Sequence, residues 1–340
     1  MLLVAGCATK NPTGKSHVFF PAPPDEPRIQ YLTSFGSESD LGGRNEFAKF
    51  VLGGRDVSRP IVKPYGVTST KGIIYVCDTQ IAAVEIVDLA KRTIKYLKPT
   101  GEAALNVPIN VAVDQNNVRY VTDTKREQVL IYDKNNNFLG NLGAKGEMKP
   151  CGIAVAGDRL YVTDLKNHCV RVYKTANREL LFTIPRDPAD PKAKLFGPTN
   201  VAVGQDGRVY VSDTGGFSSQ VYDAEGKHLR TIGEQGVEIG RFVRPKGIGV
   251  DHAGRTYIVD AATNVIQLFD NDGKLLMFFG EPKSSGPGAL YLPAGLSIDY
   301  ENLGYFQQYV APGQQIEYLI LVVNQAGLQK VSVYGFLKKS

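Results

Sequence analysis

The sequence predicts an all-β fold in which six small antiparallel sheets surround a central axis, a six-bladed β-propeller. A unit of Pro, a short apolar run, Tyr-Val-x-Asp and Val-x-Val-Tyr-Asp recurs every 42 to 48 residues, and periods of about 40 to 50 residues are typical of propellers. Each unit also holds several alternating apolar and polar runs separated by Gly, Asp or Asn. The 36 Gly, 19 Pro and 17 Tyr suit short strands joined by tight turns.

Each unit is predicted to form one blade of four strands. The innermost strands of the six units begin at Pro64, Pro108, Pro150, Pro198, Pro245 and Pro293. The second strands end at Asp78, Asp123, Asp164, Asp213, Asp260 and, in a degenerate sixth copy, Asn324. A sheet this small cannot bury both faces alone, so neighbouring blades must pack face to face, and closing the ring protects the strand edges.

The two ends of the chain are expected to close the ring. Only six residues follow 331–334, which leaves the sixth unit without an outer strand. Residues 28–36 resemble the outer strands of other units, such as 275–280. We therefore expect this N-terminal strand to complete the last blade, so that residues 28–340 form a single propeller domain.

The first 27 residues indicate export and anchoring. Val4-Ala5-Gly6-Cys7 resembles a bacterial lipobox, so residues 1–7 are expected to be the remnant of a signal peptide, with lipidation of Cys7. Residues 8–27 are polar and Pro-rich and are expected to be an extended tether that holds the domain away from the membrane. No Asp directly follows Cys7, which favours the outer membrane over the inner membrane of a bacterial envelope.

The repeats resemble a known family. Asp164-x-x-Asn167-His168-x-Val170-x-Val172-Tyr173 looks like part of an NHL repeat, and comparable patterns cover roughly residues 61–335. The complete arrangement is similar to NHL-type propeller lipoproteins of metal-respiring anaerobic bacteria. That resemblance implies an envelope protein as partner, either a multihaem cytochrome or an outer-membrane conduit.

Two segments depart from the repeat. Residues 45–54 combine an Asn cap, helical apolar spacing and a Gly stop, and are expected to form a short helix. Residues 300–317 are an insertion in blade six, in which Asn302 is expected to cap a helical turn. The aromatic residues expected on that turn are Tyr305, Phe306 and Tyr309. They either cover the protein's own core or form a docking surface.

The strand order predicts where a partner or ligand would bind. The start of each inner strand and the loop between the second and third strands share one face, which we call the mouth. The residues after the six prolines lie there: Tyr65, Ile109, Cys151, Thr199, Lys246 and Ala294. The basic residues expected at the mouth are Lys125, Arg126, Lys149, Lys166, Arg244 and Lys246. They serve solubility or attract an acidic partner; the net charge of +5 is too dispersed to indicate nucleic acid.

The sequence offers little chemistry. A repeated Asp is better explained by hydrogen bonds to the following turn than by calcium, which stays a minority alternative. The related peptidyl-hydroxyglycine amidating lyase binds zinc through histidines in its channel. This chain has only four, His17, His168, His228 and His252, at positions that cannot meet around one ion. No catalytic residue and no cofactor are therefore assigned.

The cysteines other than Cys7 are Cys77, Cys151 and Cys169. No CxxC spacing occurs among them. Cys151 and Cys169 begin strands that flank a common neighbour, so a disulfide between them would need a loop to bend inward. Small buried thiols are the alternative interpretation, and the sequence allows both.

These observations favour a non-enzymatic, lipid-anchored envelope scaffold. Its expected partner-binding residues lie at the mouth and in the insertion: Tyr65, Lys125, Arg126, Lys166, Lys246, Tyr305, Phe306 and Tyr309. The alternatives are a lyase or hydrolase acting in the channel and a propeller that senses a small molecule or glycan.

Overall fold

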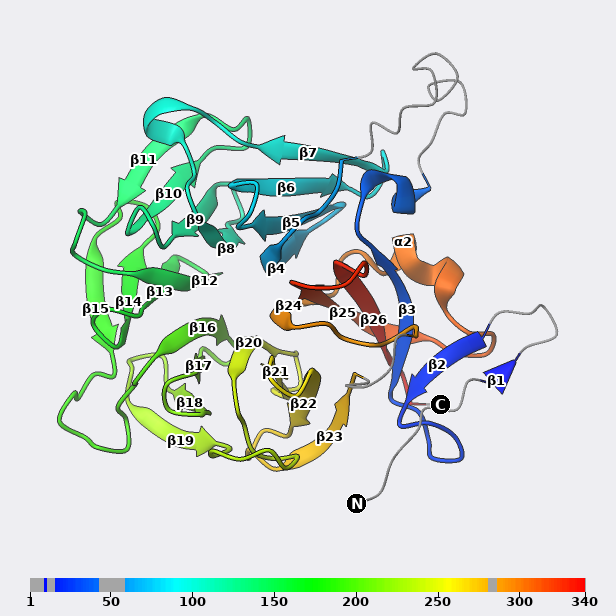
Figure 1. Cartoon of the computed structure of the whole chain (residues 1–340). Coiled ribbons are helices and arrows are strands. Elements are labelled where there is room, and N and C mark those ends of the chain that lie inside the picture. Colours follow the sequence, from blue (N-terminus) through cyan, green and yellow to red (C-terminus); the bar gives the residue numbers. More distant parts are fainter. Residues whose placement is uncertain (1–8, 11–15, 43–58, 281–285, 340) are drawn as a thin grey trace, which may run out of the picture.

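Six antiparallel sheets surround a central axis in the computed structural model, which confirms the predicted six-bladed β-propeller (Figure 1). The structure describes residues 9–10, 16–42, 59–280 and 286–339. The helix expected over residues 45–54 lies outside these ranges. In blades one to five the strand nearest the axis comes first in the sequence and the outermost strand comes last.

Blades one to five each contain four strands, named in order from the axis outwards. Blades one to three comprise β4 (Pro64–Thr70), β5 (Ile73–Asp78), β6 (Ala83–Asp88) and β7 (Thr93–Leu97); β8 (Pro108–Val113), β9 (Arg119–Asp123), β10 (Gln128–Tyr132) and β11 (Phe138–Leu142); and β12 (Pro150–Ala156), β13 (Arg159–Asp164), β14 (Cys169–Lys174) and β15 (Leu180–Ile184). Blades four and five comprise β16 (Pro198–Val203), β17 (Val209–Asp213), β18 (Ser218–Tyr222) and β19 (His228–Ile232); and β20 (Pro245–Val250), β21 (Thr256–Asp260), β22 (Val265–Phe269) and β23 (Leu275–Phe279).

Blade six is closed by the N-terminal strand, as predicted. From the axis outwards it contains β24 (Pro293–Asp299), β25 (Ile316–Asn324), β26 (Val331–Leu337) and β3 (Ile29–Phe35). β3 runs antiparallel to β26, with Phe35 opposite Val331 and Ile29 opposite Phe336. In Figure 1 the blue β3 lies beside the red β26, so residues about 300 apart in sequence form one ladder.

Two further strands extend blade six where the sequence suggested a tether. β2 (Ser16–Phe20) pairs with β3, and β1 (Thr9–Lys10) pairs with β2. Val18, Phe19 and Phe20 are each at most 9% exposed. Val18 and Phe20 pack on apolar side chains of blades five and six, and Phe19 packs on those of blades six and one. The folded domain therefore begins before residue 28, and residues 16–20 do not hold it away from a membrane.

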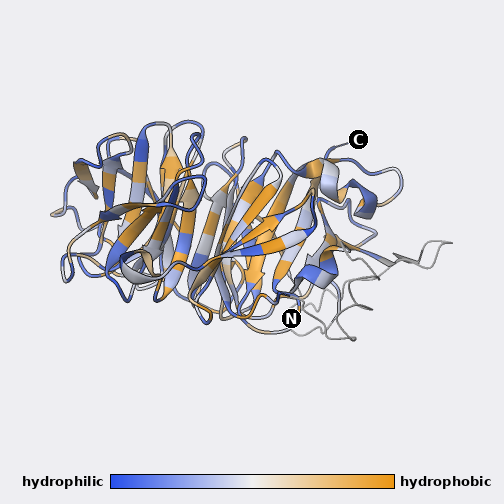
Figure 2. Cartoon of the chain, turned by 90° about the horizontal axis from the view of Figure 1, so that it is seen from above, coloured by the Kyte–Doolittle hydropathy of each residue, from blue (hydrophilic) through white to orange (hydrophobic). Residues whose placement is uncertain are grey.

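The core lies between neighbouring blades. For example, Tyr75 and Leu97 of blade one pack with Val111, Val121 and Leu130 of blade two. Figure 2, which shows the ring from the side, has the apolar segments concentrated in the strands and the polar ones in the connecting loops. Each blade therefore depends on both neighbours to bury its faces.

The remaining helical elements are short: η1 (Glu38–Leu41), η2 (Gly101–Ala103), α2 (Leu303–Phe306) and η3 (Gln307–Tyr309). Among the described residues, no helix has the length and apolar character needed to cross a bilayer.

Candidate binding site at the mouth of the propeller

The repeated aspartates build the mouth. Asp78 accepts hydrogen bonds from the backbone N–H groups of Val62 and Lys63 at 2.7 and 2.8 Å, and from those of Gln80 and Ile81 at 2.8 and 3.1 Å. One carboxylate thus fixes both the loop that enters a blade and the turn that follows its second strand. The other aspartates at this position, Asp123, Asp164, Asp213 and Asp260, also accept from backbone N–H groups. Their structural interpretation is confirmed.

This arrangement weakens the hypothesis of a calcium site, because the carboxylate oxygens already accept hydrogen bonds from backbone N–H groups. Within the described residues, no three His, Cys, Asp or Glu side chains are grouped so that they could hold a metal ion.

A narrow neck lies just below the mouth, two residues after each proline. Gly66, Gly152, Gly247 and Gly295 occupy four of these six positions, and a Cβ added at any of them would lie within 2.4 to 2.7 Å of backbone in the next blade. Asn110 of blade two and Asn200 of blade four occupy the other two, with Asn110 Nδ2 donating to Asn200 Oδ1 at 3.0 Å. The inner strands therefore approach as closely as glycine allows.

A lysine and a tyrosine meet above the neck. Lys246 of β20 donates from Nζ to the Tyr65 hydroxyl of β4 at 2.6 Å, and its Nζ lies 4.4 Å from the centre of the Tyr65 ring. Lys246 is only 5% exposed. Burial, and secondly the charge of Arg244, lower the pKa of Lys246 to about 8, while burial raises the pKa of Tyr65 well above its usual range.

The other predicted basic residues differ in their exposure. Lys125, Lys149, Lys166 and Arg244 are exposed, whereas Arg126 is half-buried. The Arg126 guanidinium donates to the carbonyl oxygens of Glu102 and Ala104 at 2.7 and 2.6 Å. Arg126 therefore supports the mouth loops more than it presents charge to a partner.

The structure adds residues that the sequence reasoning missed. Lys63 is exposed at the mouth, directly before Pro64, as Lys149 and Arg244 are before their prolines. Because Lys63 occupies the same position of the repeat as Lys149 and Arg244, the sequence could have predicted it. The apolar side chains Phe196, Val237, Ile239, Leu292 and Leu328 are also exposed in mouth loops, at 60%, 73%, 39%, 38% and 91%. No periodic signal marks them, because they lie in loops of different length.

The insertion of blade six lies at the opposite end of the blade from the mouth. Pro293 at the start of β24 pairs with Asn324, whereas Asp299 at its end pairs with Leu319. The insertion connects that far end to β25. The partner-binding residues expected at the mouth and those expected in the insertion therefore lie at opposite ends of the blade.

The insertion covers the core of blades six and one. Phe306 is 5% exposed and packs in the apolar cluster, so its side chain is not available to a partner. Asn302 makes no capping hydrogen bond to α2; its Oδ1 accepts from Gly72 N–H at 2.7 Å, and its Nδ2 donates to Thr70 O at 3.0 Å. The residue expected as a cap thus fastens the insertion to blade one.

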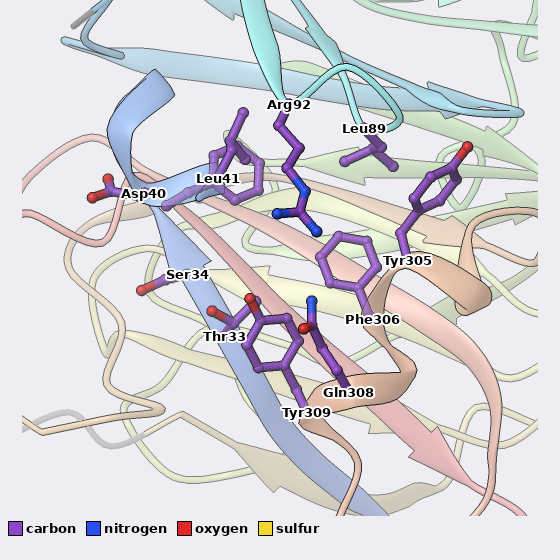
Figure 3. A pocket seen from close by; sticks show the side chains of 11 residues that line it. Thr33, Ser34, Asp40, Leu41, Leu89, Arg92, Tyr305, Phe306, Gln308 and Tyr309 are labelled. Carbon is purple, nitrogen blue, oxygen red and sulfur yellow. The ribbon is translucent and has the colours of Figure 1, made fainter. Parts of the chain in front are cut away.

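A small pocket of 70 Å³ remains beside the insertion (Figure 3). Tyr305, which is 40% exposed, and the partly buried Tyr309 line it together with Arg92 of blade one. Figure 3 shows the Arg92 guanidinium pointing towards Phe306 and Gln308. The pocket is too small for more than a few atoms, so Tyr305 is the insertion aromatic that a partner could reach most easily.

The channel below the neck is lined mainly by small and aliphatic side chains. Its 270 Å³ are bounded by residues of all six inner strands, among them Val67, Val111 and Val201. The four histidines are dispersed: His17 contacts Gln30, His228 contacts Gln220, His252 stacks on Tyr300, and His168 is exposed on the mouth side.

The cysteine alternatives are resolved for the described residues. Cys77, Cys151 and Cys169 are all free thiols, so the Cys151–Cys169 disulfide is not formed. The two cysteines flank β13, with Asp164 opposite both Pro150 and Cys169. Burial raises the pKa of Cys151 to about 12, which makes its thiol a poor nucleophile at neutral pH.

The NHL repeat family matches residues 148–173, which fall in blade three. The molecule is a six-bladed β-propeller that carries an NHL repeat. None of the curated protein sequences matches the chain.

Solved structures share the propeller fold at low sequence identity. A protein of unknown function from Bacteroides thetaiotaomicron is 17% identical with a TM-score of 0.63, covering 91% of this chain and 75% of its own. Virginiamycin B lyase from Staphylococcus aureus with quinupristin is 12% identical with a TM-score of 0.55, covering 81% and 96%. A chain of the nidogen–laminin complex is 15% identical with a TM-score of 0.52, covering 66% and 85%. At these identities the likeness shows the fold alone.

Proposed function

We propose that this NHL-type propeller is a non-enzymatic, lipid-anchored binding scaffold of a bacterial cell envelope, and that its mouth docks an acidic partner protein. The observation that carries the proposal is the composition of one face. Exposed lysines and an arginine lie on the same face as five exposed apolar side chains. Large apolar side chains with a charged surround are the usual make-up of a protein interface.

The charges at the mouth lack ion-pair partners among the residues that the structure describes. Among the described residues, Lys63, Lys125, Lys149, Lys166 and Arg244 form no ion pair with a carboxylate. Such charges raise the association rate of an oppositely charged partner, and the effect falls as salt is added. By the family resemblance, a multihaem cytochrome or an outer-membrane conduit is the proposed partner class. The nidogen–laminin complex shows the same fold within a protein complex.

Charge reversal at the mouth tests the docking. We expect Lys63→Glu with Lys149→Glu to reduce partner recovery from solubilised envelopes at least about tenfold at low salt, because two exposed cations become anions on the docking face. The matched control is Lys134→Glu with Lys227→Glu, two exposed lysines in the turns between third and fourth strands, away from the mouth. Quantitative mass spectrometry of the captured proteins measures the effect. Equal recovery with both double variants would contradict docking at the mouth.

The lipid anchor would hold blade six near the bilayer. Thr9 pairs with His17 of β2, so only two residue steps, about 7 Å of chain, separate Cys7 from the sheet. We propose that lipidation of Cys7 therefore places the outer edge of blade six at the membrane, with no long spacer between them.

Intact mass tests the anchor. We expect the protein isolated from its native envelope to begin at Cys7 and to carry the added mass of acyl chains. Cys7→Ser should release it from the membrane fraction, whereas Cys151→Ser, which removes a buried thiol, should leave it membrane-bound. An unmodified Cys7 in the membrane fraction would contradict lipidation.

A further inference from the structure

Lys246 is a buried cation with incomplete hydrogen bonding. It is 5% exposed, and the Tyr65 hydroxyl at 2.6 Å accepts one of its three N–H donors. No other described group accepts a hydrogen bond from its Nζ, and no described carboxylate pairs with it. Burying an ammonium group in this way is costly unless an oppositely charged group completes it.

The titratable groups around Lys246 are hydrogen-bond donors and cations. Arg244 and Lys149 lie close enough to influence the charge states of Tyr65 and Cys151, which face Lys246 from blades one and three. The Tyr65 phenol stays protonated at neutral pH because burial raises its pKa. Since its oxygen accepts from Lys246, its own O–H remains available as a second donor towards the axis.

The neck begins directly after this pair, because Gly66 follows Tyr65 and Gly247 follows Lys246. The Asn110–Asn200 hydrogen bond joins blades two and four, and the neck glycines bring the inner strands together at the same level. Asn200 is 4% exposed, and its Nδ2 has no hydrogen-bond partner. A ligand entering from the mouth would therefore stop above the neck, where the unfilled groups are donors.

We propose that Lys246 and Tyr65 together form a site that binds a carboxylate. The ammonium and the phenolic O–H can each donate to a carboxylate oxygen, which supplies the missing counter-charge. The carboxylate comes either from a free small molecule or from an Asp or Glu side chain of the docked partner. The site goes beyond the docking proposal, because it rests on the buried pair and does not require the exposed rim.

The pH dependence of binding follows from the groups that face the pocket. Lys246 has a pKa of about 8, whereas that of Cys151 is about 12 and that of Tyr65 lies far above neutrality. Of these three groups, only Lys246 titrates between pH 6 and 9. The affinity should therefore be constant below about pH 7 and fall by up to about tenfold per pH unit above pH 8, as the ammonium is lost.

Titration of the full-length chain with sodium propionate at constant ionic strength tests the site. The NMR signal of the Lys246 side chain, assigned by its loss in Lys246→Met, should shift saturably at pH 6.5 and much less at pH 9.5. Tyr65→Phe, which keeps the ring, should weaken binding at least about fivefold. Lys134→Met, in an exposed turn away from the mouth, should change it less than about twofold. No saturable response, or an unchanged affinity in Tyr65→Phe, would overturn the proposal.

A second titration, with a peptide in place of propionate, distinguishes the two sources of carboxylate. A hexapeptide of glutamates that binds more tightly than propionate, and loses this advantage in Lys63→Glu with Lys149→Glu, would assign the site to a partner's side chain. Equal affinities would assign it to a free carboxylate. Failure of the docking proposal would appear as unchanged partner recovery, and it would leave the propionate result in place.

Discussion

A chain that begins at residue 37 is expected not to fold into a cooperative propeller. It lacks β3, which pairs along β26 and contributes Ile29, Leu32 and Phe35, exposed at 0%, 7% and 3%. Truncating a single buried side chain of this size costs about 2 to 5 kcal/mol. The loss of three, together with a complete strand ladder, approaches or exceeds the whole stability of about 5 to 15 kcal/mol usual for a domain.

β3 also carries a buried polar contact that closes the ring. Gln30 is fully buried; its Nε2 donates to Tyr309 O at 2.8 Å, and its Oε1 accepts from Ala311 N–H at 3.0 Å. Without β3 the backbone of the insertion loses these partners, and the edge of β26 is left unpaired next to apolar side chains. An edge of this kind pairs with other chains, so we also expect aggregation.

Thermal unfolding followed by circular dichroism, with size-exclusion chromatography, measures this effect. The matched control begins at Ser16 and keeps β2 and β3; it should unfold cooperatively and elute as a compact species. If the chain beginning at residue 37 unfolds with the same midpoint as the control, closure by β3 is not what holds the ring together.

Glu85→Gln is expected to stabilise the protein increasingly as the pH rises above about 5. Glu85 is fully buried in β6, and among the described residues neither of its carboxyl oxygens has a hydrogen-bond partner. Burial, and secondly the Asp78 carboxylate, raise the pKa of Glu85 to about 10. The equivalent positions of blades three, four and five hold Arg171, Gln220 and Gln267, and Arg171 Nε donates to Asp164 at 2.9 Å.

The direction of the effect follows from proton binding. Between the unfolded pKa of about 4.3 and the folded pKa of about 10, native Glu85 holds a proton that the unfolded chain releases, so stability falls with rising pH. The penalty grows by up to about 1.4 kcal/mol per pH unit and reaches about 4 kcal/mol near pH 7. A glutamine at this position has no ionisable group, so it removes this pH-dependent loss of stability.

The measurement is urea unfolding of both proteins at pH 4, 6 and 8. The difference in unfolding free energy between Glu85→Gln and the parent protein should grow from small at pH 4 to several kcal/mol at pH 8. Glu225→Gln, at an exposed turn of blade four, is the control and should show no such trend. A difference for Glu85→Gln that does not vary with pH would show that Glu85 is ionised in the folded protein.

Much of the architecture was predictable because each blade repeats the same pattern of buried strands and turns. Tyr161-Val162-Thr163-Asp164 predicts a buried strand followed by a turn, and the Asp then bonds the backbone as expected. The role of residues 16–20 was not predictable from their composition. Ser-His-Val-Phe-Phe, set within a Pro-rich stretch, becomes a strand only because β3 offers it a free edge and the apolar clusters of blade six and its two neighbours accept its side chains.

The sequence by itself determined the number of blades, the strand that closes the ring and the side of each blade on which Tyr65 and Lys246 lie. These features depend on the repeat period, on the alternation of apolar and polar residues and on strand direction, all of which can be read from neighbouring residues in the sequence. Only the tertiary structure decided that Lys246 meets Tyr65 across 181 positions, that Phe306 is buried and that the insertion lies away from the mouth. Such contacts depend on how closely the six inner strands approach one axis. That separation cannot be predicted from any local sequence pattern.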